Sequence, residues 1–438
     1  MPVDPETPSF SNDVTRRKFI AVAACTAGAM FIKPSLVHGS EANSAVRVGL
    51  LGCGGRGTED ATNLVDTGGA RVVALGDMFQ DQLDVARKHF DEMQQGKGYA
   101  ALDASQLFVG PDAYKRIADS KEVDAIVIAT PPYYHPQHLE AVVHAKKHVY
   151  LEKPVAVDVP GALKVIEIGK HADTKLSLDV GFQIRDCPPF VELVNRIHNG
   201  ALGNIVCGEA HYLTGYIDRP AWPNASPMER RLRNWVYDRT LSGDIIVEQN
   251  IHVIDICNWI LKNHPLKASA TGGRQGRPAN DGDAYGNYNV VFHYPDDVDV
   301  TFSSTQFAKG WWDVTERFFG TKGTSQSPYT GPLGIWGDEP WQYAPSVKPA
   351  PETGQQQAFS VTGNFTSNLE LADKEKKKAF VDSITSGNFH NQAAKGAESA
   401  LSCIMARTAA YTGREVTWDE TMKSKEVWDP KIDLKKLS

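Results

Sequence analysis

Hydrophobic and polar positions follow an alternating pattern in the first part of the chain. From Val46 to about residue 180, short apolar runs such as VRVGLLG and DAIVIATPP alternate with stretches whose apolar residues recur at helical spacing. Parallel strands need a crossover connection, usually a helix, so strands that alternate with helices predict a parallel sheet covered by helices. Residues 45–180 are therefore predicted to form an α/β domain.

The pattern changes beyond about Gly181. Segments such as IVCGEAHYLTG, YGNYNVVFHY and DVTFSSTQF alternate apolar and polar residues with a period of two, which is typical of strands with one buried face. Residues 181–438 are predicted to form an α+β domain with a large, mostly antiparallel open sheet.

Two segments of this second part stand out by composition. Residues 325–357 are rich in Pro, Gly and Gln but carry several aromatic residues, which predicts a packed loop. Such a loop would serve as an arm that embraces a second subunit, the favoured reading, or as a rim that faces a carbohydrate. The run KEKKK, from Lys374 to Lys378, predicts a solvated helix face.

The N-terminus carries the features of an export signal. Arg16 and Arg17 precede an apolar run from Phe19 to Ile32, which is too short for a membrane span of about 20 residues. Residues 1–39 are predicted to be a twin-arginine signal, so the mature protein would be periplasmic or otherwise exported, and free of the membrane. Two alternatives remain, an ordinary terminus that happens to contain an arginine pair and a lipid anchor at Cys25.

Charge and cysteine content narrow the classes of function. The chain has 46 basic and 53 acidic residues, a net charge of -7 and no basic stripe, so nucleic acid is not expected as a partner. Its six cysteines form neither a CxxC pair nor a zinc-like spacing, and they are predicted to be mostly buried thiols. A protein that binds a small molecule is expected.

The first strand leads into a glycine motif. Gly52, Gly54 and Gly57 satisfy GxGxxG, and a predicted helix follows directly. In this strand–turn–helix context the glycines let the backbone approach a pyrophosphate, whose charge is met by the helix N-terminus. Gly55 and Arg56 complete the expected cofactor turn of a Rossmann domain.

Asp77 ends the next strand at 77 - 52 = 25 residues from the first glycine. A carboxylate at this place binds the ribose hydroxyls of a dinucleotide and repels a 2'-phosphate. Met78 and Phe79 follow it with no cation nearby in the sequence. The predicted cofactor is NAD rather than NADP.

The stretch ATPPYYHPQHLEAVVHAKKHVYLEKP, together with the glycine motif, resembles the GFO/IDH/MocA family of glucose–fructose oxidoreductases and inositol dehydrogenases. The resemblance runs from Val46 to about Glu420. It implies a Rossmann domain before a domain for substrate binding and oligomerisation, and a homo-oligomer, either a dimer or a tetramer. The implied activity is NAD-dependent oxidation or reduction of a hydroxyl on a sugar, polyol or glycoside.

The resemblance also implies catalytic residues. Glu152 and Lys153 belong to the family's EKP motif, which places Lys153 beside nicotinamide and substrate. In GDIIVEQNIHVIDICNWI, Glu248 and His252 stand four residues apart and would share one face of a helix if the stretch is helical. His252 is then the general base. Many relatives have Asp at the position of Glu248, which leaves open whether Glu248 touches the substrate or only orients His252.

Further cofactor contacts follow from the same resemblance: Thr130, Pro131, His135 and Gln183, in addition to Glu152 and Lys153. The expected substrate contacts are Arg233, Trp235 and Tyr237, because such side chains can stack on a sugar face and bind its hydroxyls, although surface solvation would explain the arginine equally well. No metal is predicted, because the HxxH pair of His135 and His138 has no third ligand in sight.

The predicted export of the protein limits how it can use its cofactor. Free NAD is expected to be scarce outside the cytoplasm, so a protein that folds around NAD before export would hold it tightly and recycle it in place. A glycosidase or lyase that oxidises its substrate transiently is the alternative enzyme, although Lys153 favours the oxidoreductase. A non-catalytic sugar- or NAD-binding protein is disfavoured because Lys153 and His252 occur together.

Overall fold

The computed structural model describes residues 45–172, 174–344 and 368–437. Its first part contains a six-stranded parallel sheet in the order β3-β2-β1-β4-β5-β6, which confirms the predicted α/β architecture. The strands are β1 (Val46–Leu51), β2 (Ala70–Asp77), β3 (Leu107–Val109), β4 (Ala125–Ile128), β5 (His148–Leu151) and β6 (Leu178–Val180).

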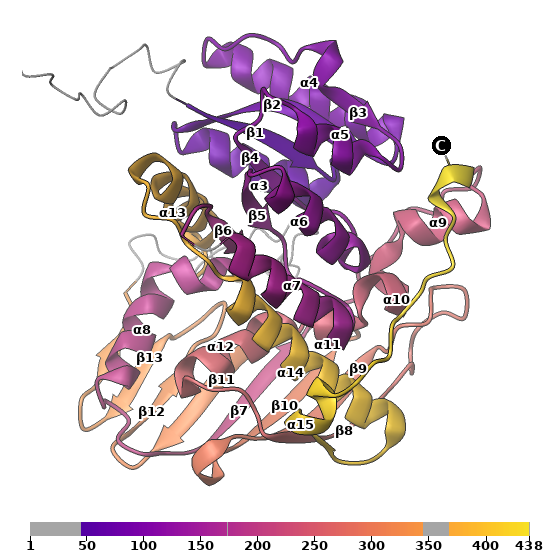
Figure 1. Cartoon of the computed structure of the whole chain (residues 1–438). Coiled ribbons are helices and arrows are strands. Elements are labelled where there is room, and N and C mark those ends of the chain that lie inside the picture. The colour runs from indigo at the N-terminus through magenta and orange to yellow at the C-terminus, as the bar shows by residue number, and fades with distance from the viewer. Residues whose placement is uncertain (1–44, 173, 345–367, 438) are drawn as a thin grey trace, which may run out of the picture. The chain divides into compact units, whose positions relative to one another are not determined.

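Helices cover both faces of this sheet, as Figure 1 shows. The central strand β4, AIVI, is therefore buried on both faces, and its four residues are all apolar. The helices of this part are α3 (Gly55–Asp66), α4 (Gln80–Gly96), α5 (Ala113–Asp119), α6 (His135–His144) and α7 (Val159–Ala172).

The second part contains a nine-stranded sheet in the order β14-β13-β12-β11-β7-β10-β9-β8-β15. All of its pairings are antiparallel except the one between β7 and β10, so the predicted mostly antiparallel sheet is confirmed. The strands are β7 (Ile205–Leu213), β8 (Lys267–Gly273), β9 (Asn287–His293), β10 (Asp299–Thr305), β11 (Asp313–Gly320), β12 (Gly323–Gln326), β13 (Gly334–Gly337), β14 (Trp341–Gln342) and β15 (Val416–Thr417).

Helix α14 (Ala393–Thr412) packs against α7 of the first part and against β8 of the large sheet (Figure 1). A side chain at its Gly396 would come within 2.9 Å of Val155 and Val180, so the close approach requires glycine. The other helices of the second part are α8 (Pro188–His198), α9 (Pro227–Arg233), α10 (Arg239–Ser242), α11 (Ile245–Glu248), α12 (Ile251–Leu261), α13 (Ala372–Ser386) and α15 (Trp418–Met422).

The loop predicted for residues 325–357 is wrong in its first half. This stretch includes the end of β12 and all of β13 and β14, which extend the sheet edge through antiparallel pairs such as Ser325 with Ile335. Gly331 has a φ of 107°, which allows the chain to turn between β12 and β13. Residues 345–367 lie outside the described residues, so the role of an arm or a rim stays a prediction.

The solvated face predicted for the KEKKK run is wrong for Lys376 and Lys377, whereas Lys374 and Lys378 are exposed as predicted. The side chains of Lys376 and Lys377 are 0% exposed, whereas that of Lys378 is 54% exposed. Helix α13 directs Lys376 toward Asp179 and Lys377 toward Asp60. These two buried carboxylates of the parallel-sheet part compensate the positive charges of the lysines. Sequence composition could not reveal these partners, because they lie about 200 to 300 residues away along the chain.

The predicted signal, residues 1–39 with Arg16, Arg17 and Cys25, lies outside the described residues. In the part of the chain that is described, no helix is both long and apolar enough to cross a membrane. The cysteines of this part are free thiols; all except Cys207 are buried, which confirms the prediction of mostly buried thiols.

Candidate active site

The glycine turn joins β1 to α3. Gly52 has a φ of 97°, and a side chain there would come within 2.6 Å of the Ala129 carbonyl. A side chain at Gly57 would collide with the carbonyl oxygen of Gly52, whereas one at Gly54 would meet open space. The first turn of α3 has no side-chain cap and no acidic residue. Gly54 and the uncapped helix end thus fit the pyrophosphate of a dinucleotide.

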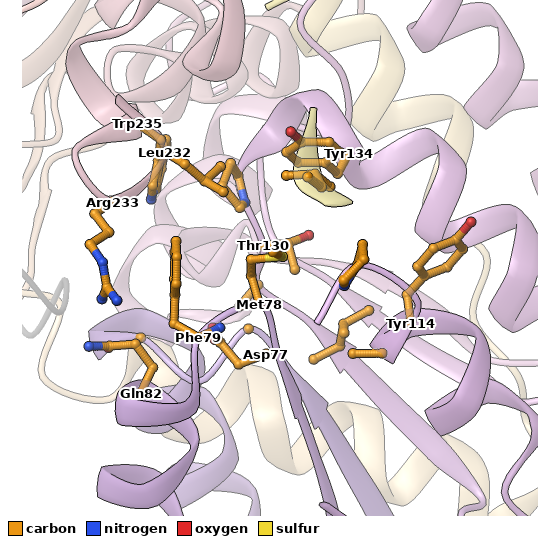
Figure 2. A pocket seen from close by; sticks show the side chains of 18 of the residues that line it. Asp77, Met78, Phe79, Gln82, Tyr114, Thr130, Tyr134, Leu232, Arg233 and Trp235 are labelled. Carbon is orange, nitrogen blue, oxygen red and sulfur yellow. The ribbon is translucent and has the colours of Figure 1, made fainter. Parts of the chain in front are cut away.

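Asp77 lies beside this turn, at the end of β2. One carboxylate oxygen accepts a hydrogen bond from the Cys53 amide at 2.7 Å, and the other accepts one from the Phe79 amide at 2.8 Å. The side chain is buried, and burial raises the pKa of its carboxyl group. It lines a cavity of about 190 Å³, shown in Figure 2, where it is placed to meet ribose hydroxyls.

Arg233 lines the same cavity as Asp77 (Figure 2), and it is absent from the lining of the cavity that holds Lys153 and His252. Its guanidinium lies 3.7 Å from the ring centroid of Phe79 and bonds Asp81 at 2.9 Å. No cation lies near Phe79 in the sequence, but in the folded chain α9 brings Arg233 beside it from the second part. The expectation that this end of the cavity has no cation is therefore wrong. A second acid, Glu229 at 2.8 Å, also offsets its charge, so Arg233 offers no free cation to a 2'-phosphate.

A second cavity, of about 210 Å³, shares Gly54, Ala129, Thr130 and Trp235 with the first. It lies at the carboxyl ends of β4 and β5, where parallel sheets bind their ligands. Its lining brings together most of the catalytic and cofactor residues expected from the sequence: Gly54, Gly55, Arg56, Gly57, Thr130, His135, Glu152, Lys153, Gln183, Glu248 and His252.

Lys153 is held in this cavity by Glu248. Its ammonium donates to the Glu248 backbone carbonyl at 2.7 Å and to the carboxylate at 3.1 Å. The two residues of the second motif do not share one helix, because α11 ends at Glu248 and α12 begins at Ile251. Glu248 and His252 line the same cavity nonetheless, and Glu248 orients Lys153 rather than His252.

His252 is 7% exposed, and its Nδ1 atom has no hydrogen-bond partner among the described residues. Burial, reinforced by the positive charge of Lys153, lowers the pKa of the imidazole well below its usual value. The ring is therefore neutral at neutral pH and can accept a proton.

The other predicted cofactor residues divide between ligand-facing and structural positions. Gln183 is buried in the second cavity with its amide oxygen unpartnered among the described side chains and backbone. His135 places its ring nitrogens 2.7 Å from the Thr130 carbonyl and 2.8 Å from the Pro154 carbonyl, so it fastens two loops together. Pro131 lines the first cavity.

The remaining predicted substrate residues are also separated. Trp235 lines both cavities, whereas Tyr237 lines neither. The Tyr237 hydroxyl bonds the backbone of Ile217 instead, at 2.8 Å and 3.1 Å. Of the three predicted substrate residues, only Trp235 therefore lines the cavity that also holds Lys153 and His252.

Arg219 and Leu434 are among the lining residues that sequence reasoning missed. Arg219 follows β7 in an irregular segment and reaches the second cavity, and Leu434, close to the C-terminus, lines the first. Neither belongs to a motif, so no local signal marks them. The described residues contain no group of His, Cys, Asp and Glu side chains that could hold a metal ion.

A buried cluster of five charged side chains, the α13 cluster, lies behind the glycine turn. Arg56 bonds Glu152 at 3.1 Å, Asp60 at 3.0 Å and Asp373 at 2.7 Å. Lys377 bonds Asp60 at 2.6 Å and Asp373 at 2.7 Å. Because Glu152 precedes Lys153, the cluster connects α13 to the turn that carries Lys153.

Comparison with curated proteins finds inositol dehydrogenases. An inositol 2-dehydrogenase of Rhizobium meliloti (strain 1021) is 26% identical over 294 residues, which cover 66% of this chain and 78% of the relative. Inositol 2-dehydrogenase 4 of Saccharopolyspora erythraea is 32% identical over 162 residues, or 37% of this chain and 43% of that relative. The chain thus matches less than half the length of the second relative.

Solved structures share the fold. Levoglucosan dehydrogenase in complex with NADH and levoglucosan has a TM-score of 0.65 at 19% identity, over 85% of this chain and 99% of that one. The aldose–aldose oxidoreductase from Caulobacter crescentus complexed with glycerol has a TM-score of 0.65 at 17% identity, with the same coverage.

Family models match both parts of the chain. The model described as "Oxidoreductase family, NAD-binding Rossmann fold" matches residues 46–180, and the GFO/IDH/MocA C-terminal domain model matches residues 190–326. The glycine turn and Asp77 have the geometry that this cofactor requires. The chain therefore belongs to the GFO/IDH/MocA oxidoreductase family, and it is an enzyme of that type with NAD as its cofactor.

Proposed function

We propose that the protein transfers a hydride between NAD and a hydroxyl-bearing carbon of a sugar, polyol or glycoside. The observation that carries this proposal is that the Lys153 ammonium and the neutral His252 ring line one cavity, which continues into the cavity of Asp77. The activities of the relatives, inositol and levoglucosan dehydrogenation, support a carbohydrate-like substrate.

Lys153 and His252 have different roles at the oxygen of the substrate hydroxyl that reacts. Lys153, oriented by Glu248, donates a hydrogen bond to this oxygen and stabilises its negative charge as the O–H proton leaves. His252 accepts that proton, and Gln183 has an amide oxygen available for a neighbouring hydroxyl. NAD, when bound, supplies the hydride acceptor.

We also propose that the cofactor is held tightly. The C-terminal segment after α15 reaches the first cavity, where Leu434 forms part of the lining. Ile432, Leu434 and Leu437 pack onto an apolar cluster that includes Phe79, and Pro430 accepts a hydrogen bond from Arg231 at 3.1 Å. A cofactor beneath this segment would be released only after the segment lifts, which favours oxidation and reduction in place.

Tight binding agrees with export through the twin-arginine route, which we propose from the N-terminal residues. We further propose a homo-oligomer that uses the open face of the large sheet, where Val206, Phe319 and Trp336 are exposed. Light scattering on the purified protein would measure the assembly; a monomer at micromolar concentration would refute that part.

The decisive experiment uses full-length protein purified from its native compartment. Desalted protein should retain bound nucleotide, and added sugars and polyols should change its absorbance at the NADH band and give a ketone or lactone. Cleavage of a glycosidic bond without net redox would favour the glycosidase or lyase. NAD binding without turnover of any sugar or polyol would refute the proposed reaction.

A further inference from the structure

Arg219 brings a positive charge into the second cavity from the segment after β7. Its Nε atom is buried, and its guanidinium has no hydrogen-bond or carboxylate partner among the described residues. The guanidinium lies over the ring of Tyr237, whose centroid is 5.7 Å away. A guanidinium that loses part of its hydration without gaining a partner is costly, so an anion bound beside Arg219 would stabilise the arrangement.

The charges of the cavity lining leave Arg219 uncompensated. The lining contains three cationic side chains, Arg56, Lys153 and Arg219, and two carboxylates, Glu152 and Glu248. Arg56 bonds Glu152 at 3.1 Å, and Lys153 bonds Glu248 at 3.1 Å.

Asp281, whose charge also acts on Arg219, is bonded elsewhere as well. Asp281 bonds the guanidinium of Arg277 at 3.1 Å and interacts with the Tyr216 hydroxyl. Burial is the main influence on the Arg219 guanidinium and lowers its pKa. Glu248 and Asp281 also act on the Arg219 charge, but Glu248 is bonded to Lys153 and Asp281 to Arg277, so no carboxylate among the described residues is bonded to Arg219.

We propose that Arg219 binds a carboxylate of the substrate, so that the preferred substrate is a sugar acid such as a uronate or an aldonate. The inference rests on the proposed function, because it assigns the substrate class of the same cavity. Arg219 would fix the acid group at one end while Lys153 and His252 act on a hydroxyl at the other.

A carboxylate fits this position better than a phosphate. One guanidinium offers two parallel N–H donors, which match the two oxygens of a single carboxylate. A phosphate carries nearly two negative charges at neutral pH and would need a second cation. The phosphates of the cofactor have their own site at the uncapped start of α3. Ile217, Trp235 and Val236 belong to the same cavity lining, and an apolar lining lowers the local dielectric constant, which would strengthen the pairing.

The test compares matched substrates on the full-length protein loaded with NAD. Glucose with glucuronate and gluconate, galactose with galacturonate, and the corresponding sugar 6-phosphates form the panel. The acids should have the higher kcat/KM. Arg219→Met should lower kcat/KM for the acids by about 10-fold to 100-fold, the range for losing a charged hydrogen-bonded pair, and should leave the neutral sugars nearly unchanged. Arg219→Lys should recover part of the loss.

Arg230→Met is the matched control, because Arg230 on α9 is exposed and bonds only the Ala225 carbonyl among the contacts recorded for its side chain. It should behave as wild type. Equal losses on acids and neutral sugars in Arg219→Met, a preference for the sugar phosphates, or a weaker NAD affinity in Arg219→Met would each overturn the carboxylate assignment.

A binding measurement tests the carboxylate site at Arg219 independently of the proposed reaction. If no compound is turned over, the thermal midpoint of the NAD-loaded protein is measured with glucuronate and with glucose. A rise with glucuronate in wild type that is lost in Arg219→Met would support the carboxylate site although the proposed reaction fails. No difference between the two proteins would refute the site itself.

Discussion

Replacement of Lys377 by Met tests the α13 cluster. Lys377 is 0% exposed, and its ammonium lies 2.6 Å from Asp60 and 2.7 Å from Asp373. The substitution keeps most of the side-chain volume and removes the charge. Arg56 would then be the only cation left in the cluster to face the three carboxylates of Asp60, Glu152 and Asp373.

Removing one partner of a buried ion pair destabilises a protein by about 3–5 kcal/mol, because the other charge stays buried without compensation. Burial raises the pKa of Asp60, so this carboxyl group can take up a proton when the ammonium is lost. The loss in the free energy of unfolding should therefore lie near the lower end, about 3 kcal/mol.

The pH dependence has a definite sign. A carboxyl group whose pKa is raised in the folded state favours folding at low pH, and that contribution is lost as the pH rises through the folded pKa. Without Lys377 the pKa of Asp60 rises further. Lys377→Met should therefore be less destabilised at pH 5.5 than at pH 8.

Urea denaturation followed by circular dichroism and tryptophan fluorescence measures both effects. The control is Lys378→Met on the next residue of the same helix, whose side chain is 54% exposed and pairs with Asp382 at the surface. The control should change stability by about 0–0.5 kcal/mol. Equal stability of the two variants, or a loss in Lys377→Met that does not change with pH, would refute the reasoning.

Three further predictions concern turnover and the cofactor. Lys153→Met and His252→Ala should each lower the rate of single-turnover hydride transfer by about 10²-fold or more. The double variant should lose far less than the product of the two single losses. A near-wild-type rate in either single variant would remove that residue from the mechanism. Because burial lowers the pKa of His252, kcat/KM should not fall as the pH is lowered through 6.5. If wild type instead fell to half its maximal kcat/KM near pH 6.5, and His252→Ala showed no such fall, the buried neutral ring would be contradicted. Truncation after Asp429 should speed the release of NAD, measured by stopped-flow fluorescence, since Leu434 no longer closes the first cavity; an unchanged release rate would exclude the C-terminal segment as a cover.

The sequence by itself determined the local elements of the protein and the first half of its site. The glycine turn, Asp77 at the end of β2 and the Lys153 turn at the end of β5 could be placed because each lies within a few residues of a strand whose apolar pattern is unambiguous. Parallel strands bring their carboxyl ends to one edge, so these residues converge whatever the rest of the chain does.

The tertiary structure decided what each side chain meets. Lys377 and Lys378 are neighbours of the same type, yet one is buried beside Asp60 and the other is exposed, because only the packing of α13 distinguishes them. The pairing of Glu248 with Lys153, the compensation of Arg233 and the uncompensated charge of Arg219 depend in the same way on residues far apart in the chain. The spacing of apolar residues predicts which face of a helix or strand is buried. The residues that pack against this face come from distant parts of the chain, so no local sequence pattern predicts them.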